Sequence, residues 1–247
     1  MDKNKWKDRR NLMKKNLVIT LIVVGLMIPA FFVFRGNPPI KIDWFDTNYL
    51  NMTAGYELTI LLLSFVVILI TGLQTRFQSL KLLSITKIDG EIRPEPWIGI
   101  TEKNKDTWKK FGLTMTIIVS IITGIVLYFQ VYKKGTIQPF TAGNFLLVVL
   151  LALINSFVEE VVFRHTFASI VEYHEMSPYV SQGLSALIFG VGHYFGSPGG
   201  IPGVLMAGYL GWISSKSIHE TKGFFWAWMI HFVQDIIIMT GWYLTMS

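Results

Sequence analysis

The sequence predicts an all-α membrane protein, a polytopic bundle of about seven transmembrane helices, with a range of six to eight. Two observations lead to this prediction. The chain of 247 residues is 51% apolar and only 15% charged, whereas soluble domains usually carry about 25% charged residues. Its apolar residues also gather in runs of about 20, the length that a helix needs to cross the hydrocarbon core of a bilayer.

Seven such runs follow one another, and each is expected to form one helix. They cover approximately residues 17–34, 56–74, 111–132, 144–170, 178–195, 200–215 and 223–245. The fifth and sixth runs are short and rich in glycine, so their ends are the least sharply defined. Small residues recur at four-residue spacing along the sixth run, at Gly199, Gly203, Ala207 and Gly211. Such a stripe lets membrane helices approach closely, so we expect tight packing there and no chemistry.

The basic residues indicate how the chain is oriented. Residues 1–16 hold seven of the 22 Lys and Arg residues and residues 75–110 hold eight. Two predicted helices separate these segments, so both lie on one side of the membrane, and cytoplasmic loops carry the excess of Lys and Arg. We therefore expect a multi-pass cell-membrane protein, surrounded by lipid, with a cytoplasmic N-terminus. This placement of the net charge of +6 argues against nucleic-acid binding.

The fourth apolar run contains three charged residues within six positions, Glu159, Glu160 and Arg164. A charge at the centre of a spanning helix costs about 2.5–3.5 kcal/mol on insertion scales, so these side chains must pair or face a polar cavity. Glu160 and Arg164 lie one helical turn apart on one face, and Glu159 is rotated from Glu160 by about 100°. We expect a structural Glu160–Arg164 ion pair and a Glu159 that faces a cavity. The alternative is an interfacial helix end with all three residues in water.

Two histidines lie inside later apolar runs. His193 is near the end of the fifth run, and His231 and Asp235 lie one helical turn apart in the seventh. Ionisable residues within membrane segments are functional candidates, and these residue types can activate water. One such histidine alone is more often a packing residue, but two histidines with charged partners on three helices indicate a site. His174 and His219 fall in predicted turns and are expected to be solvated.

These residues are similar to the three motifs of the CAAX-processing and bacteriocin-processing family of intramembrane peptidases, also called Abi. The motifs read Glu159-Glu160-x-x-x-Arg164, Phe189-x-x-x-His193 and His231-x-x-x-Asp235. One motif alone would be a weak indication, whereas three in order on predicted membrane helices are specific. The resemblance implies an intramembrane endopeptidase that acts on a peptide or on a membrane-associated protein.

The resemblance covers roughly residues 140–240 and suggests a division of the chain into two parts. Residues 140–247 would form the catalytic helix bundle. Residues 1–139 would contribute N-terminal membrane helices and the cytoplasmic loop 75–110, in which Arg93-Pro94-Glu95-Pro96 interrupts helical structure.

The resemblance also implies residue roles. Glu159 would be the base that activates water, His193 and His231 would complete the site, and Glu160 with Arg164 would support it. Asp235 departs from the family pattern, because the prenyl-protein branch has asparagine at this place. Asparagine can donate a hydrogen bond to a developing oxyanion, whereas an ionised aspartate only accepts. Asp235 therefore either orients His231 or is protonated.

Two interpretations of the cofactor requirement stay open. Glu159, His193 and His231 could be three ligands of a zinc ion with an open fourth position, and family members are commonly labelled metalloproteases. The compact His-Glu-x-x-His motif is absent. In the prenyl-protein branch of the family that this chain resembles, the site is understood as glutamate-based and without metal. We favour a mechanism that requires no cofactor, with a divalent metal, zinc above all, as the alternative. The absence of cysteine excludes thiolate ligands and cysteine nucleophiles.

Two other functions fit the same residues. A bacteriocin-immunity or peptide-binding protein would keep the fold and recognise a peptide without cutting it. A transporter could relay protons or a metal ion through the Glu159–His231 cluster, but the inverted repeats that many transporters show are not visible. A prenylated C-terminal peptide, a bacteriocin and a peptide-pheromone precursor are all candidate substrates.

Overall fold

The computed structural model describes residues 3–101, 107–131, 133 and 141–245, and this part of the chain is built from helices with no strand. The predicted all-α fold is therefore confirmed. The helices are α1 (Lys3–Gly36), α2 (Asn48–Gln74), α3 (Trp108–Gln130), α4 (Ala142–Glu160), α5 (Thr166–Tyr173), α6 (Pro178–Gly192), α7 (Gly200–Thr221) and α8 (Phe225–Thr245). A π-helical turn, Val161–His165, joins α4 to α5 without a break.

Each of the seven apolar runs lies on a helix, the fourth on the continuous stretch from α4 to α5. Within the described residues, four stretches are long and apolar enough to cross a membrane: Lys7–Gly36, Asn48–Gln74, Trp108–Gln130 and Ala142–Tyr173. Large apolar side chains such as Leu26, Leu69 and Ile121 are more than half exposed on these helices. An apolar exterior of this extent is typical of a surface that faces lipid. The protein is a membrane protein; the count of seven spans stays a prediction.

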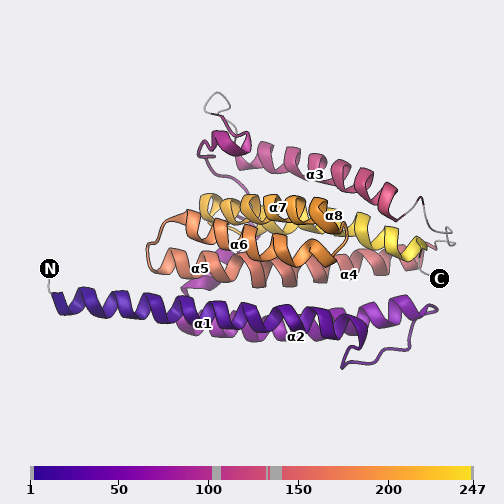
Figure 1. Cartoon of the computed structure of the whole chain (residues 1–247), viewed down its shortest axis with the longest axis horizontal. Helices are drawn as coiled ribbons and strands as arrows, with labels where there is room; N and C mark the ends of the chain where they lie inside the picture. Colours follow the sequence, from indigo (N-terminus) through magenta and orange to yellow (C-terminus); the bar gives the residue numbers. More distant parts are fainter. Residues whose placement is uncertain (1–2, 102–106, 132, 134–140, 246–247) are drawn as a thin grey trace.

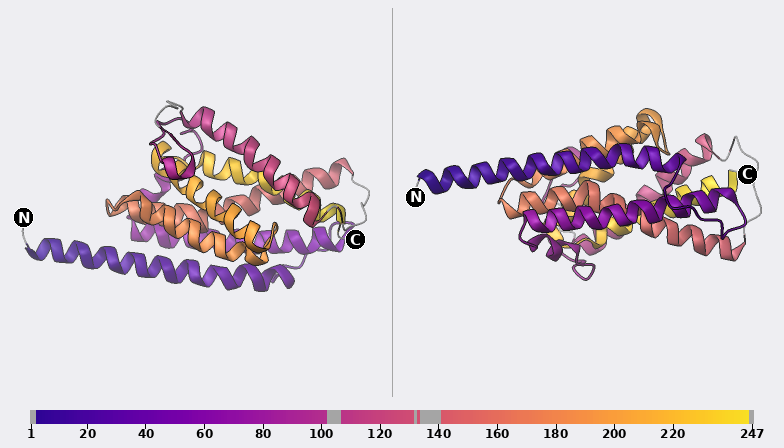
Figure 2. Two further views of the ribbon diagram at one scale, coloured as in Figure 1. Left: turned by 45° about the horizontal axis from the view of Figure 1, so that its top comes forward. Right: turned by 90° about the horizontal axis from the view of Figure 1, so that it is seen from below.

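The helices form layers around α4 and α8 (Figure 1). α1 and α2 lie along one side, α3 lies along the opposite side, and α4 to α8 occupy the middle; the two further views agree (Figure 2). α4 packs on both α2 and α8, α8 packs on α3, and α6 packs on α7. One cluster of buried apolar residues extends across all layers, from Val24 and Ile60 through Val158 to Ile230 and Met115. This arrangement places the three motifs, which lie on the middle helices, inside the bundle.

The small residues of the sixth apolar run make the close helix contact that their spacing predicted. A Cβ atom added at Gly211 would lie 2.8 Å from the carbonyl oxygen of Ser185 on α6. One added at Gly190 of α6 would lie 2.9 Å from the carbonyl oxygen of Val204 on α7. Backbone contact at this distance leaves no room for a side chain, so α6 and α7 are held at a fixed spacing.

The predicted cytoplasmic loop, residues 75–110, is shorter than expected. α3 begins at Trp108, and the preceding segment contains the 3₁₀ turns Gln78–Leu83 and Pro96–Ile98. Glu95 of this segment is buried, with Oε1 2.8 Å from the Lys216 ammonium. It also accepts a hydrogen bond of 2.7 Å from the indole N–H of Trp212. The loop is therefore fastened to α7.

The sixth run was expected to end at residue 215, but α7 continues to Thr221. The reason is the neutralisation of Lys216, whose ammonium group lies between the carboxylates of Glu95 and Glu220, at 2.8 and 2.7 Å. Because two carboxylates neutralise the Lys216 ammonium, the helix can continue through the protein interior at this residue instead of ending in water. Glu220 is fixed in turn by the Trp108 indole N–H, at 2.8 Å.

The expectation that His219 is solvated was wrong. Its side chain is buried, with Nε2 2.5 Å from the Ser181 hydroxyl and Nδ1 2.6 Å from Glu172 Oε1. The longer α7 carries His219 into the contact with α5 and α6. His174 is partly exposed, and its Nε2 lies 3.1 Å from the side-chain nitrogen of Asn16.

Candidate active site

The two adjacent glutamates lie where the fourth helix changes its geometry. α4 ends at Glu160, and the next five residues form the π-helical turn. The Thr166 hydroxyl donates to the carbonyl of Val161, at 2.7 Å, across this wider turn. π-Helical turns are rare and are frequently found at functional sites. The hydrophobic pattern of the sequence predicted one regular helix here and gave no sign of the π turn.

The expected Glu160–Arg164 ion pair is present. Nη1 of Arg164 lies 3.3 Å from Oε1 of Glu160, and both side chains are fully buried. The guanidinium also lies over the ring of Phe189, with its central carbon 3.6 Å from the ring centroid. Both charges thus have a partner of opposite sign in the core, and the stacking on Phe189 connects the π turn to α6.

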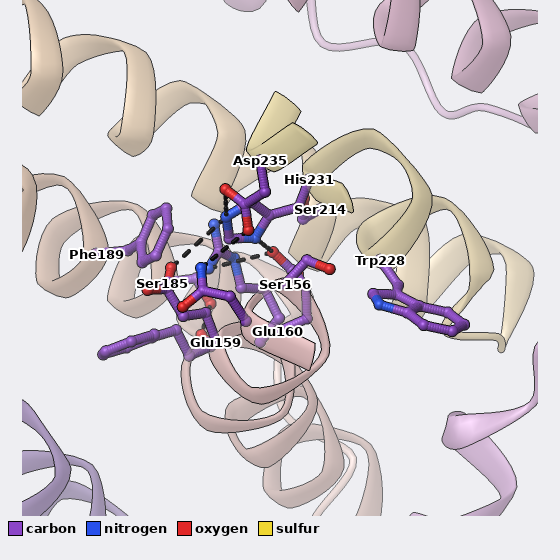
Figure 3. A network of polar contacts seen from close by, with 12 residues as sticks. Ser156, Glu159, Glu160, Ser185, Phe189, Ser214, Trp228, His231 and Asp235 are labelled. Carbon is purple, nitrogen blue, oxygen red and sulfur yellow. Dashed lines mark hydrogen bonds and ion pairs between the residues drawn. The ribbon is translucent and has the colours of Figure 1, made fainter. Parts of the chain in front are cut away.

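His231 lies among three carboxylates, from α4 and α8. Its Nδ1 is 2.8 Å from Glu160 Oε1, and its Nε2 is 3.6 Å from Glu159 Oε2 and 3.5 Å from Asp235 Oδ1. Figure 3 shows these side chains converging in one polar network. Because ionised Glu160 can only accept a hydrogen bond, the proton on this contact belongs to Nδ1 of His231. Nε2 is left facing Glu159 and Asp235.

A residue that the sequence analysis did not single out fixes Asp235. The side-chain amide of Asn155, on α4, donates a hydrogen bond of 2.9 Å to Asp235 Oδ2. An asparagine one helical turn before Glu159, within an apolar run, was a signal that could have identified it. The Asn155 contact leaves Oδ1 of Asp235 directed at His231.

His193 reaches the same site from the end of α6. The helix ends at Gly192, and the Nδ1 of His193 lies 2.9 Å from the carbonyl oxygen of Phe189. The carbonyl can only accept, so Nδ1 carries the proton, and Nε2 of the neutral ring is an acceptor. The ring packs against Phe189, with centroids 4.1 Å apart.

The predicted site residues other than the Glu160–Arg164 ion pair line one cavity of about 300 Å³. Glu159, His193, His231 and Asp235 all line it. The structure therefore brings together residues from three separate motifs on one internal surface. A second, smaller cavity of about 100 Å³ also reaches Glu159 and His193, and its other lining residues are mostly apolar side chains of α1 and α6.

Residues from the first two helices line the larger cavity as well, and sequence reasoning missed them. They include Arg35 at the end of α1 and Tyr49, Tyr56 and Glu57 on α2. Glu57 lies inside an apolar run, so the rule that identified Glu159 could have found it.

The sequence offered Glu159, His193 and His231 as zinc ligands. Within the described part of the chain, no three His, Asp or Glu side chains converge as a ligand set. Nε2 of His231 lies 3.6 Å from Glu159 Oε2 and 3.5 Å from Asp235 Oδ1. No step proposed below goes through a metal.

Fold and site together define a class of protein: a membrane helix bundle in which glutamate, histidine and aspartate side chains meet in an internal cavity. Residues 141–237 match the family described as type II CAAX prenyl endopeptidase, Rce1-like. The match agrees with the CAAX-protease family that the three motifs indicated, over this part of the chain. The match contains every candidate site residue and leaves α1, α2 and α3 outside. No curated protein and no solved structure matches the chain.

Proposed function

We propose that the protein is an intramembrane endopeptidase that hydrolyses a peptide or a membrane-associated protein with water activated by Glu159. One observation carries the proposal. Glu159 lines the cavity beside His193, His231 and Asp235, whereas its neighbour Glu160 is committed to Arg164 and to Nδ1 of His231. Glu159 is thus the glutamate of the motif whose carboxylate is available for proton transfer.

The proposed reaction uses Glu159 twice. Glu159 takes a proton from water as the water oxygen attacks the scissile carbonyl carbon, which forms a tetrahedral oxyanion. The same carboxyl then gives the proton to the departing amine, and the peptide bond breaks into a carboxylic acid and an amine. Proton transfer by a positioned side chain typically contributes about 10²–10⁴ to the rate.

The two histidines would hold the reacting atoms. Glu160 fixes His231 through Nδ1, so Nε2 is directed at the place between Glu159 and Asp235 where water would bind. His193 presents Nε2 as an acceptor, because Nδ1 donates to the backbone. When His231 is protonated on both nitrogens, Nε2–H can donate to the oxyanion, which stabilises the developing charge. Asp235, held by Asn155, orients His231.

The basic segments suggest the side from which substrate arrives. We assign residues 1–16 and 75–107 to the cytoplasm because Lys and Arg gather there. The cavity is lined at its far end by Tyr49, near the start of α2, and Trp242, near the end of α8. These helix ends lie opposite the N-terminus (Figure 1). On this topology the cavity faces the external side, which favours exported peptides over cytoplasmic proteins as substrates.

The test is a comparison of peptides from cells that produce either the wild-type protein or Glu159→Gln at equal levels. Mass spectrometry should find peptides with new termini in the wild type that are absent from the variant. Identical peptide sets, together with a biological activity that Glu159→Gln preserves, would instead support a peptide-binding or immunity protein of the same fold.

A further inference from the structure

Glu57 is a buried carboxylate that the proposed reaction does not use. It lies on α2 with a side chain that is 1% exposed, and both carboxylate oxygens are buried without a hydrogen-bond partner. No ion pair within the described residues includes it. Polar groups in protein interiors almost always have a partner, so this carboxylate requires an explanation.

The cost of this arrangement argues against a packing role. An uncompensated buried charge typically costs several kcal/mol, and an apolar residue of similar volume would serve the packing better. Protonation would remove the charge, but the protonated group would still lack a hydrogen-bond partner. A ligand that brings both a positive charge and hydrogen-bond donors would satisfy both oxygens.

The position of Glu57 shows where such a ligand would lie. Its side chain lines the cavity of about 300 Å³ that also contains Glu159 and Asp235. The lining of this cavity thus includes three acidic residues, from α2, α4 and α8. Arg35 also lines the cavity but is exposed at the end of α1, where water screens its charge. His231 contacts Glu159 and Asp235, so Glu57 is left as the acidic residue of the lining without an ion-pair partner among the described residues.

We propose that Glu57 forms a specificity subsite that binds a lysine or arginine side chain of the substrate peptide. An ammonium or guanidinium group supplies several N–H donors, and its charge-assisted hydrogen bonds to a carboxylate are about twice as strong as neutral ones. The subsite lies on α2, outside the residues that match the Rce1-like family. Its placement beside a scissile bond rests on the proposed role of Glu159, whereas the binding of the cation does not.

Binding can be measured without cleavage. Protein with Glu159→Gln is placed in lipid nanodiscs and incubated with a mixed hexapeptide library, and the retained peptides are sequenced by mass spectrometry. We expect Lys and Arg to be enriched about tenfold, the size of one charge-assisted contact. The enrichment should disappear in Glu57→Gln/Glu159→Gln. It should persist in Glu175→Gln/Glu159→Gln, which makes the same change at an exposed residue outside the cavity.

Cleavage separates failure of the subsite from failure of the proposed function. With Glu159 intact, Glu57→Gln should lower kcat/KM about tenfold for lysine peptides and leave that for norleucine peptides unchanged. If the enrichment of Lys and Arg depends on Glu57 but the wild type cleaves no peptide, the proposed peptidase activity is refuted and the proposed subsite is supported. If the wild type cleaves lysine peptides and Glu57→Gln leaves their kcat/KM unchanged, the proposed subsite is refuted and the peptidase activity is supported. The thermal stability of Glu57→Gln should be no lower than that of the wild type, which excludes misfolding as the cause.

Discussion

The imidazole of His231 contacts both glutamates of the fourth helix, with Nδ1 2.8 Å from Glu160 and Nε2 3.6 Å from Glu159. Glu160 is also 3.3 Å from Arg164 in the protein interior. Two neighbouring residues of the same type therefore have different environments. One is part of a charge-compensated support, and the other is open to the cavity, which is the basis for the predictions that follow.

Replacing Glu159 with Gln should abolish cleavage and leave the protein folded, because the side chains are nearly isosteric and only the base is lost. The expected loss is about 10²–10⁴ in kcat. Single-turnover assays on purified protein, with gel filtration as the folding control, measure it. His193→Ala and His231→Ala should be severely impaired in the same assay. Cleavage by Glu159→Gln at the wild-type rate would overturn the catalytic assignment.

Arg164→Ala should lower stability as well as activity. The change leaves Glu160 buried without its cation, and breaking a buried pair in this way costs about 3–5 kcal/mol in soluble proteins. Thermal unfolding in detergent, compared with Glu175→Ala at an exposed position, measures the loss. Wild-type stability with lost activity would show that Arg164 takes part in the chemistry instead.

Asp235→Asn should keep more activity than Asp235→Ala. Asparagine retains an oxygen that can accept from His231, although the rotated amide loses part of its contact with Asn155. We expect a loss of about tenfold for Asp235→Asn, comparable to one hydrogen bond to a charged group, and a larger loss for Asp235→Ala. Equal kcat/KM values for the two variants would contradict an orienting role for Asp235.

Thorough metal removal should leave activity unchanged. The proposed mechanism assigns the activation of water to Glu159, and within the described residues no group of three His, Asp or Glu side chains is placed to hold a metal ion. Purified enzyme is assayed after dialysis against a chelator, with metal content measured by mass spectrometry. Activity that is lost on chelation and restored by zinc would replace the glutamate mechanism with a metal-dependent one.

Cysteines introduced at opposite ends of the bundle should react from opposite sides of the membrane. The chain has no cysteine of its own, so Trp44→Cys and Asp89→Cys are each the single thiol, and both positions are exposed. A membrane-impermeant thiol reagent on intact cells should label Trp44→Cys at once and Asp89→Cys only after permeabilisation. Labelling of Asp89→Cys on intact cells would reverse the orientation proposed for the cavity.

Local patterns of the sequence predicted a large part of this protein. Runs of about 20 apolar residues predicted the helices, because helix formation in a bilayer depends on residues that are neighbours in the chain. The spacing of Glu160 and Arg164 predicted their ion pair for the same reason. Three motifs identified the residues that line one cavity, since their order along the chain is characteristic of the family.

The remaining features arise from contacts between distant segments. The hydrogen bond from Asn155 to Asp235 joins residues 80 positions apart, and the extension of α7 depends on Glu95, which neutralises Lys216 from another segment. The unpaired carboxylate of Glu57 faces the cavity because α2 packs on α4. The sequence by itself determined which segments are helical and which residues could react, since both follow from local chemistry. Only the tertiary structure decided which charges are compensated, because burial and partners depend on how the helices pack.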